Sequence, residues 1–302
     1  MSGRDVEQRP SETAMFAALR RTLANKQYAD EGFGPDYLAE CFLPPHYRFF
    51  LTFKWMRSST KDRLDRFLPG LTEYVMARTA YFDDLFNEAL KDKIPQIVLL
   101  GAGYDSRAYR FAGMNRGTRI LELDIAPTQE RKKKCLEKAH VRIPQQLTFV
   151  PINFNEDSLG DVLEKSGFKD GEKTLFLWEG VTYYLDAESV DAVLSYVGHL
   201  SNSQSTIAFD YAISLSEENV DDYYGAREFV QTMKEHHAEE ELTFSVGKGE
   251  IESFLGQRGL RIVDHLDNEE IEGAWLVDDD GSVIGQVTGH FRFVVASPTN
   301  EV

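Results

Sequence analysis

The chain has 302 residues, of which 42% are hydrophobic and 27% charged, a composition typical of a globular protein that buries a substantial core. No apolar run is long enough to span a membrane, and the polar stretch from Met1 to Glu12 lacks the apolar segment of a signal peptide. The net charge of −17 argues against nucleic acids and anionic membranes as partners, because proteins that bind them usually present a basic face.

The cysteines give no sign of a disulfide framework or a metal centre. Cys41 and Cys135 are far apart in the sequence and lie in helical patterns, as expected of reduced thiols in a cytoplasmic protein. No spacing of cysteine and histidine is typical of a metal site, so we expect no bound metal.

The first 92 residues predict a helical cap. Residues 1–10 resemble a disordered tail, and Ser11 is a suitable N-cap for the first helix of a cap that spans residues 11–92. Further helices are expected at 35–43, at 46–57, where the segment is rich in aromatic residues, and at 71–91.

From residue 93 onward, strands and helices alternate, as in a sheet of mostly parallel strands with helices on both faces. We therefore predict an α/β, Rossmann-like domain over residues 93–302 with a seven-stranded sheet, interrupted by an acidic helical insertion at about 214–241. The expected strands are 96–101, 118–124, 147–151, 174–178, 205–211, 260–265 and 291–296, and one of the last pair is antiparallel.

A glycine-rich turn after the first strand is the central feature of this domain. The apolar run that begins at Ile97 ends in Gly101-Ala102-Gly103, where glycines let the backbone turn sharply and approach a ligand closely. A helix is expected from residue 105 to 112, with Asp105 as its N-cap.

The next strand ends in an acid, Asp124, twenty-one residues beyond Gly103. A strand, a glycine-rich turn, a helix and a strand that ends in a carboxylate form a unit that binds a nucleoside through its ribose hydroxyls. The dinucleotide fingerprint requires a third glycine where this chain has Ser106, and Asp105 brings negative charge to the turn. The pattern therefore favours S-adenosyl-L-methionine (SAM), which carries cationic groups and no phosphates, over NAD.

Polar and aromatic residues follow the remaining strands at the same edge of the sheet, where open α/β sheets bind their ligands. Asn153 and Phe154 follow the third strand, and Glu179 follows the fourth. Asp210 and Tyr211 end the fifth strand and are the candidates for a catalytic base.

Five motifs, in this order, resemble the leucine carboxyl methyltransferase-like family of SAM-dependent methyltransferases, including its bacterial branch of O-methyltransferases. The motifs are Arg78-Thr-x-x-Phe82-Asp83, Leu100-Gly-Ala-Gly-Tyr-Asp-Ser-Arg107, Glu122-Leu-Asp124, Val150-Pro-Ile-Asn-Phe154 and Glu179-Gly-Val-Thr-Tyr-Tyr-Leu185. The resemblance extends over residues 12–297 and implies a class I methyltransferase fold with SAM as cofactor and S-adenosyl-L-homocysteine as product.

The resemblance also implies roles for individual residues. Arg78 would reach the carboxylate of the methionine part of SAM, and Gly101 would pack against the cofactor. Asp124 would hold the ribose hydroxyls with Glu122 supporting it, and Glu179 would approach the methionine amino group or the sulfonium.

Three segments extend or depart from the family pattern. Asn153 and Phe154 would flank the adenine, although the bacterial branch commonly has Asp-Leu there. Lys26 lies in a segment similar to a lysine-bearing one that binds the cofactor in eukaryotic carboxyl methyltransferases, but the spacing after it differs. Ile125-Ala126-Pro127 replaces the usual spacing from acid to proline.

The function predicted from the sequence is SAM-dependent transfer of a methyl group to an oxygen of a small molecule or of a peptide end. A carboxylate acceptor needs no base, whereas a hydroxyl acceptor does, and both remain open. Two alternatives also remain: a degenerate, SAM-binding scaffold, and a nicotinamide-dependent oxidoreductase, which the absence of a Tyr-x-x-x-Lys pair disfavours. The sequence does not predict an oligomeric state.

Overall fold

A computed structural model describes residues 10–236 and 242–299. The tail predicted for residues 1–10 lies outside this range except for Pro10, as do residues 237–241 of the predicted insertion. None of the described helices is long and apolar enough to cross a bilayer.

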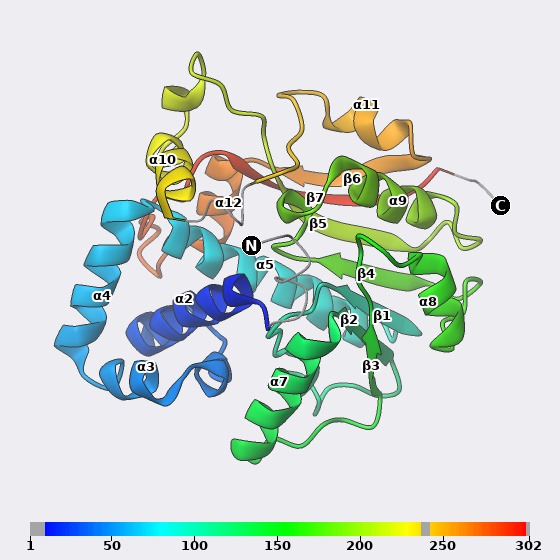
Figure 1. Cartoon of the computed structure of the whole chain (residues 1–302), viewed down its shortest axis with the longest axis horizontal. Coiled ribbons are helices and arrows are strands. Elements are labelled where there is room, and N and C mark those ends of the chain that lie inside the picture. Colours follow the sequence, from blue (N-terminus) through cyan, green and yellow to red (C-terminus); the bar gives the residue numbers. More distant parts are fainter. Residues whose placement is uncertain (1–9, 237–241, 300–302) are drawn as a thin grey trace.

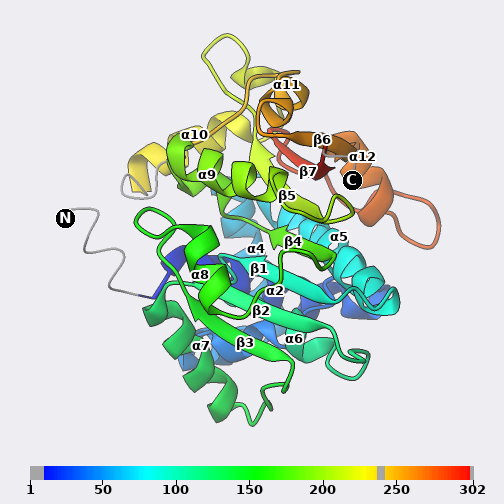
Figure 2. The ribbon, with the colours of Figure 1, turned by 90° about the vertical axis from the view of Figure 1, so that its right-hand side faces the viewer.

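Seven strands form one sheet in the order β3-β2-β1-β4-β5-β7-β6 (Figures 1 and 2). Every pairing is parallel except those of β7, which runs antiparallel to both β5 and β6, so the predicted mixed sheet is confirmed. The strands are β1 Gln96–Leu100, β2 Arg119–Asp124, β3 Leu147–Pro151, β4 Thr174–Trp178, β5 Thr206–Ala212, β6 Leu260–Leu266 and β7 Phe291–Pro298.

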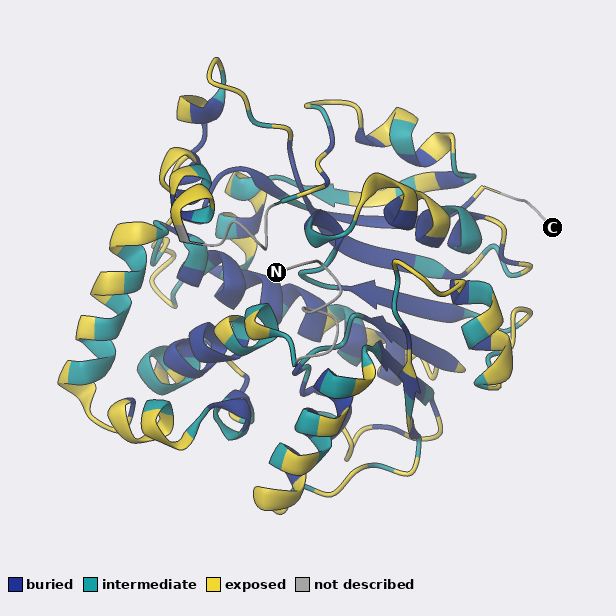
Figure 3. Ribbon diagram, viewed as in Figure 1, coloured by how far each residue is buried: buried dark blue, intermediate teal, exposed yellow. Residues whose placement is uncertain are grey.

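The central strands are buried on both faces, as their unbroken apolar runs require. Every residue of β1 and of β4 is buried, whereas most residues of the edge strand β6 retain some exposure (Figure 3). One core lies between the sheet and α2, α5, α7 and α12, and a second lies between the sheet and α8, α9 and α11. The helices are α2 Glu12–Tyr28, α3 Pro45–Phe50, α4 Lys54–Phe67, α5 Leu71–Lys91, α6 Arg107–Arg110, α7 Ala126–Lys138, α8 Leu159–Lys165, α9 Ala187–Gly198, α10 Ala226–His236, α11 Ile251–Gly256 and α12 Asn268–Trp275.

The N-terminal helices share the first core with the sheet. Helix α2 begins as predicted, because the hydroxyl of Ser11 accepts a hydrogen bond from the backbone N–H of Ala14 at 3.0 Å. The buried face of α2, which includes Leu19 and Leu23, packs against α5.

Two predictions for the cap were wrong. The helix expected at 35–43 is only a 3₁₀ turn at Ala39–Phe42. The side chain of Asp36 accepts from the backbone N–H of Leu38 at 3.1 Å, a local turn that competes with a helix, and Pro44 disfavours helix at the residue before it. The single helix expected at 46–57 is divided into α3 and α4. The helix is interrupted at Leu51, which is buried and whose carbonyl oxygen accepts from the guanidinium of Arg57 at 3.2 Å.

Three elements further along the chain also differ from expectation. Helix α6 is shorter than the predicted 105–112 and begins at Arg107. Ser106 occupies the N-cap position without a cap hydrogen bond from its side chain, whereas Asp105 accepts from the backbone N–H of Arg107 at 2.7 Å, as expected of a capping residue. The helical part of the predicted insertion comprises a 3₁₀ turn at Val220–Asp222 and α10. Helix α12 was not predicted, although Asp267 and Glu270 form a capping box at its start.

The packing of α9 against the turn before β6 can be tested at a tight contact. A Cβ built on Gly198 would lie 1.9 Å from the carbonyl oxygen of Arg258, so Gly198→Ala must displace backbone. We expect a loss of about 1–3 kcal/mol in the free energy of unfolding, measured as a lower melting temperature. The control is Gly256→Ala at the end of α11, where a Cβ meets no atom within 4 Å and stability should be unchanged or slightly higher. Equal melting temperatures for the two variants would contradict this packing.

Candidate functional site

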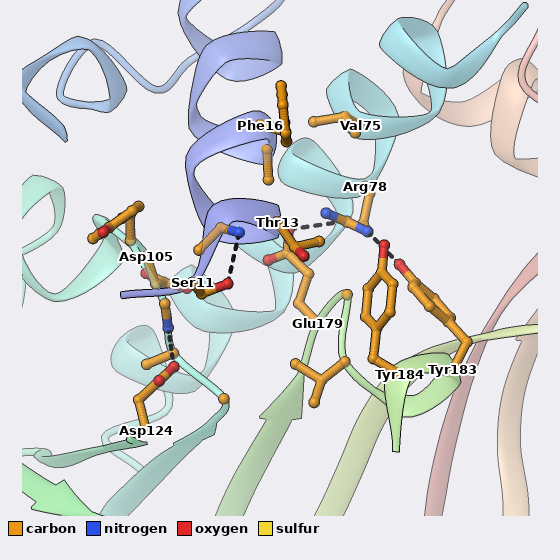
Figure 4. Close-up of a pocket in the computed structure, with 18 of the residues that line it drawn as sticks. Ser11, Thr13, Phe16, Val75, Arg78, Asp105, Asp124, Glu179, Tyr183 and Tyr184 are labelled. Atoms are coloured by element: carbon orange, nitrogen blue, oxygen red, sulfur yellow. Dashed lines mark hydrogen bonds and ion pairs between the residues drawn. The ribbon is translucent and has the colours of Figure 1, made fainter. Parts of the chain in front are cut away.

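A cavity of about 740 Å³ opens at the carboxyl ends of β1, β2 and β4, beneath α2 and beside α5 (Figure 4). This is the edge at which open α/β sheets bind ligands, and the volume lies within the usual range for a small-molecule site. Seven of the residues predicted from the sequence line this cavity: Arg78, Gly101, Gly103, Asp105, Asp124, Phe154 and Glu179.

The glycine turn has the close-packed geometry that its sequence predicts. Gly101 and Gly103 have φ angles of +61° and +46°, in the left-handed region that favours glycine. A Cβ on Gly101 would lie 2.6 Å from Val181, and one on Gly103 would lie 3.1 Å from the Cβ of Ala14 in α2. The turn therefore packs against α2 and the loop after β4 with no room for side chains.

Asp124 ends β2 directly against this turn. Its Oδ2 accepts from the backbone N–H of Gly103 at 2.6 Å, and its Oδ1 accepts from Ile125 at 2.8 Å. Burial raises the pKa of Asp124 to about 6, even though both backbone hydrogen bonds favour the ionised form. The carboxylate is thus oriented by the chain and lines the cavity.

Glu179, on the loop after β4, accepts from two buried arginines. Its Oε1 lies 3.0 Å from Nε of Arg78, and its Oε2 lies 2.6 Å from the guanidinium of Arg107. Arg78 also reaches Asp210 at 3.1 Å, and its guanidinium donates to the Tyr183 hydroxyl at 3.0 Å. One carboxylate and two cations therefore join α5, the glycine-turn segment and the loop after β4 at the cavity.

A second buried cluster supports the first from behind. Asp83, on α5, lies 2.8 Å from Nε of Arg107 and accepts two hydrogen bonds of 2.6 Å from Arg110. Asp36 lies 3.0 Å from Arg21 of α2 and accepts from the Ser106 hydroxyl at 2.7 Å. These buried pairs fix α2, α5 and α6 around the glycine turn.

Three predicted cofactor residues do not line the cavity. Lys26 pairs with Glu40 at 2.5 Å near the other end of α2. Glu122 is fully buried behind Asp124 and pairs with Lys132 at 2.7 Å, and burial raises its pKa. The side chain of Asn153 accepts from the backbone of the neighbouring Asn155 at 3.1 Å.

Neither candidate base stands free in the cavity. Asp210 is completely buried, and its oxygens accept from Tyr74 at 2.5 Å, from Arg78, and from the backbone N–H of Gly180 at 2.6 Å. Tyr211 faces the opposite side of the sheet, because successive strand residues alternate, and its hydroxyl lies 2.9 Å from Nε2 of His265. Asp210 therefore positions Arg78, and Tyr211 belongs to the second core.

The sequence reasoning missed several residues that shape the site. Arg107 and Asp83 stand inside the quoted motifs without an assigned role, and Arg20 and Phe16 line the cavity from α2. A signal was available for Arg107, because an arginine two residues after Asp105 pairs with it in a tight turn. Within residues 10–236 and 242–299, no group of three or more His, Cys, Asp or Glu side chains is arranged to hold a metal ion.

Comparison with known proteins agrees with this geometry. Residues 14–198, more than half of the chain, match the leucine carboxyl methyltransferase family. The chain belongs to this family of SAM-dependent methyltransferases. The family and the cofactor predicted from the five motifs are thereby confirmed.

Two bacterial relatives illustrate the match. The "Putative S-adenosyl-L-methionine-dependent methyltransferase YktD" of Bacillus subtilis is 30% identical over 222 residues, which cover 73% of this chain and 71% of that protein. A protein of Mycobacterium sp. strain JLS, named "Putative S-adenosyl-L-methionine-dependent methyltransferase", is 29% identical over 205 residues, 66% of this chain and 64% of its own length.

Solved structures support the fold. A DUF574 family protein from Streptomyces avermitilis superposes with a TM-score of 0.59 at 14% identity, covering 94% of this chain and 97% of that one. A structure from Thermobifida fusca, titled as a putative methyltransferase, has a TM-score of 0.57 at 14% identity, covering 97% and 96%. The predicted Rossmann-like methyltransferase fold is thus confirmed.

The contribution of the buried cluster around Asp83 to stability can be tested by substitution. Asp83→Asn leaves Arg107 and Arg110 buried without this counter-charge, which should cost about 3–5 kcal/mol in the free energy of unfolding. Thermal melting of the purified variant measures the loss. The control is Asp84→Asn, because Asp84 is exposed and an amide oxygen can still accept from Trp275. A melting temperature of Asp83→Asn equal to that of the control would contradict this assignment.

Proposed function

We propose that this chain is an O-methyltransferase that transfers the methyl group of SAM to an oxygen of a small-molecule or peptide acceptor. The observation that carries the proposal is the position of Asp124, a half-buried carboxylate held against the Gly101–Gly103 turn in a cavity that α2 lines. The acceptor is not expected to be a nucleic acid, given the net charge of −17.

The residues present fit SAM. The glycine turn brings backbone without side chains of its own to the cavity wall, and Asp124 presents oxygens that can accept from ribose hydroxyls. Asp105 and Glu179 place negative charge in the cavity, which suits the amino group and the sulfonium, and Arg78 is the partner for the methionine carboxylate. Phe154 would contact the adenine from the loop after β3.

Bound SAM would supply a methyl group already activated for displacement by the positive charge of its sulfur. The protein must then orient the acceptor oxygen in line with that methyl group and exclude water. Helix α2 covers the cavity with Ala14 and Phe16, and Phe229 and Phe291 line the walls, so this chain encloses the reacting groups mostly with apolar side chains.

The absence of a histidine among the described residues that line the cavity and the burial of Tyr74 and Tyr183 favour a carboxylate acceptor over a hydroxyl. Burial and the adjacent Asp210 raise the pKa values of Tyr74 and Tyr183 well above the ordinary value, so both phenols stay protonated and cannot act as bases. A carboxylate acceptor is ionised at neutral pH and loses no proton on methylation, so it requires no base.

Of the two alternatives, family membership removes the nicotinamide-dependent oxidoreductase. The degenerate scaffold is a second candidate, because Arg78 and Glu179 already pair with each other and with neighbouring groups. Product formation distinguishes the two functions, since a scaffold would bind SAM without turnover.

Calorimetric titration with S-adenosylhomocysteine tests the cofactor site. We expect micromolar or tighter binding, no binding of NADH, and about tenfold to a hundredfold weaker S-adenosylhomocysteine binding by Asp124→Asn, because a hydrogen bond to a charged acceptor is lost. Asp84→Asn is the matched control, since Asp84 is exposed and does not line the cavity. An unchanged affinity in Asp124→Asn would remove this residue from the site.

The acceptor class is tested with SAM labelled in its methyl group and a panel of carboxylic acids, phenols and alcohols. We expect label in products that release methanol on treatment with base, because methyl esters hydrolyse and methyl ethers do not. Base-stable products would show a hydroxyl acceptor, and binding of SAM without any product would favour the scaffold.

The pKa of Asp124 predicts how cofactor affinity depends on pH. Asp124 must be ionised to accept from both ribose hydroxyls, so affinity for S-adenosylhomocysteine should rise as pH increases through about 6. We expect affinity about tenfold weaker at pH 5 than at pH 7.5, since only about one such carboxylate in ten is ionised a unit below its pKa. The pH dependence should be absent in Asp124→Asn and retained in the control Asp84→Asn. A pH dependence that persists in Asp124→Asn would assign it to another group.

A further inference from the structure

Helices α3 and α4 are weakly buried. Neither helix contains a buried residue, and both lie at the outer edge of the molecule, mostly exposed (Figures 1 and 3). None of residues 45–67 lines the cavity. We call these residues the α3–α4 segment.

The α3–α4 segment exposes a group of aromatic side chains. Phe49 is 61% exposed, Phe50 46%, Phe53 41% and Trp55 67%. The ring centroids of Phe49 and Phe53 are 5.4 Å apart, and those of Phe49 and Phe50 are 6.0 Å apart, so the three phenylalanines form one cluster. A contiguous exposed aromatic cluster, unlike single exposed residues, marks an interaction surface.

Positive charge is concentrated in the same segment. It contains six basic and two acidic residues, a formal charge of +4 in a chain whose total is −17, which leaves −21 for the remainder. The cations that are exposed and make no ion pair with another described residue are Arg48, Lys54, Arg63 and Arg66. Lys61, in contrast, is neutralised by Asp65 and Glu73.

We propose that the α3–α4 segment docks on the surface of an anionic lipid bilayer. Aromatic rings beside free lysine and arginine side chains are the combination that interfacial helices use, because the rings enter the headgroup region while the cations face anionic lipid. Each surface cation contributes to such binding, and lysine and arginine extend their charged ends around a buried apolar stem.

The expectation that the chain avoids anionic membranes rested on its net charge. That charge is not evenly distributed, and the α3–α4 segment carries both the exposed rings and four exposed cations. A field from four unpaired cations acts over about a Debye length, roughly 8 Å at physiological salt, so the acidic remainder of the surface is largely screened from a bilayer that meets this edge. The docking is peripheral and requires no spanning helix.

Helix α4 packs against α2, α5 and α10, which line the cavity with Arg20, Val75 and Phe229 among others. A bilayer bound to the outer face of α4 would therefore lie one helix layer away from the cavity. This proposal is independent of the proposed function, because cofactor binding involves none of residues 45–67.

Co-sedimentation of the full chain with vesicles tests the proposal. The probes are vesicles of phosphatidylcholine alone and vesicles that also contain about 30% phosphatidylserine, which reproduce an anionic leaflet. We expect binding only to the second, weakened by added salt. Trp55 is the most exposed of the three tryptophans, since Trp178 is fully buried and Trp275 is partly buried, so its emission should shift to shorter wavelength on binding.

Matched variants assign the binding to this segment. Lys54→Glu with Arg63→Glu should weaken vesicle binding by at least about 30-fold, from roughly fivefold per cation at an anionic surface. Lys165→Glu with Lys169→Glu makes the same change in net charge at the end of α8 and just beyond it, across the molecule from α4 (Figure 1), and should bind as the unaltered chain does. Phe49→Ser with Trp55→Ser tests the rings, and Trp55→Phe should abolish the emission shift while binding remains.

S-adenosylhomocysteine titration of each variant reports whether the fold and the cofactor site are intact. The proposal would be overturned if the unaltered chain binds S-adenosylhomocysteine but not anionic vesicles. It would also be overturned if Lys165→Glu with Lys169→Glu weakened vesicle binding as much as Lys54→Glu with Arg63→Glu. A dimer in size-exclusion chromatography that Phe49→Ser with Trp55→Ser dissociates, without vesicle binding, would instead assign the surface to a second copy of this chain. If the unaltered chain does not bind S-adenosylhomocysteine, that result counts against the cofactor site alone.

Discussion

The site depends on one carboxylate, Glu179, shared between the buried guanidinium groups of Arg78 and Arg107. The three residues come from the loop after β4, from α5 and from the start of α6, so a single ionic contact fixes the relative positions of three elements. Buried ion pairs add little net stability, because desolvation offsets their attraction, but removal of one partner leaves an uncompensated charge. The contact therefore specifies one arrangement of the cavity walls.

The same constraint extends to the N-terminal helices through a chain of buried pairs. Asp83 joins Arg107 to Arg110, whose Nε donates to the hydroxyl of Ser106 at 2.7 Å, and Ser106 in turn donates to Asp36. Arg21 of α2 completes the series, with its guanidinium 2.8 Å from the carbonyl oxygen of Tyr104. Helix α2 is thus attached to the glycine turn by polar contacts as well as by the shared core. The cover of the cavity and its floor are positioned by the same set of charges.

The sheet and the glycine turn could be predicted because their signals are local. An unbroken apolar run that ends at Gly101 predicts a buried strand and a tight turn from adjacent residues alone. The roles of Asp210 and Lys26 could not be predicted, because they depend on partners elsewhere in the chain. Asp210 pairs with Arg78, 132 residues away, and Lys26 pairs with Glu40, 14 residues away. A strand-end acid in the sequence is equally compatible with a ligand contact and a buried pair.

Negative charge at the carboxyl edge of the sheet follows a pattern that explains why these acids differ in availability. Asp210 and Glu122 each meet a cation inside the protein, whereas Asp124 is held by backbone N–H groups and has no arginine or lysine within salt-bridge distance among the described residues. Backbone donors orient the carboxylate of Asp124 and favour its ionised form, but burial outweighs them and raises its pKa. Such a group is stabilised further when hydroxyl donors arrive from a ligand. The acid that the folded chain leaves without a cation is therefore the one best suited to hold the ribose.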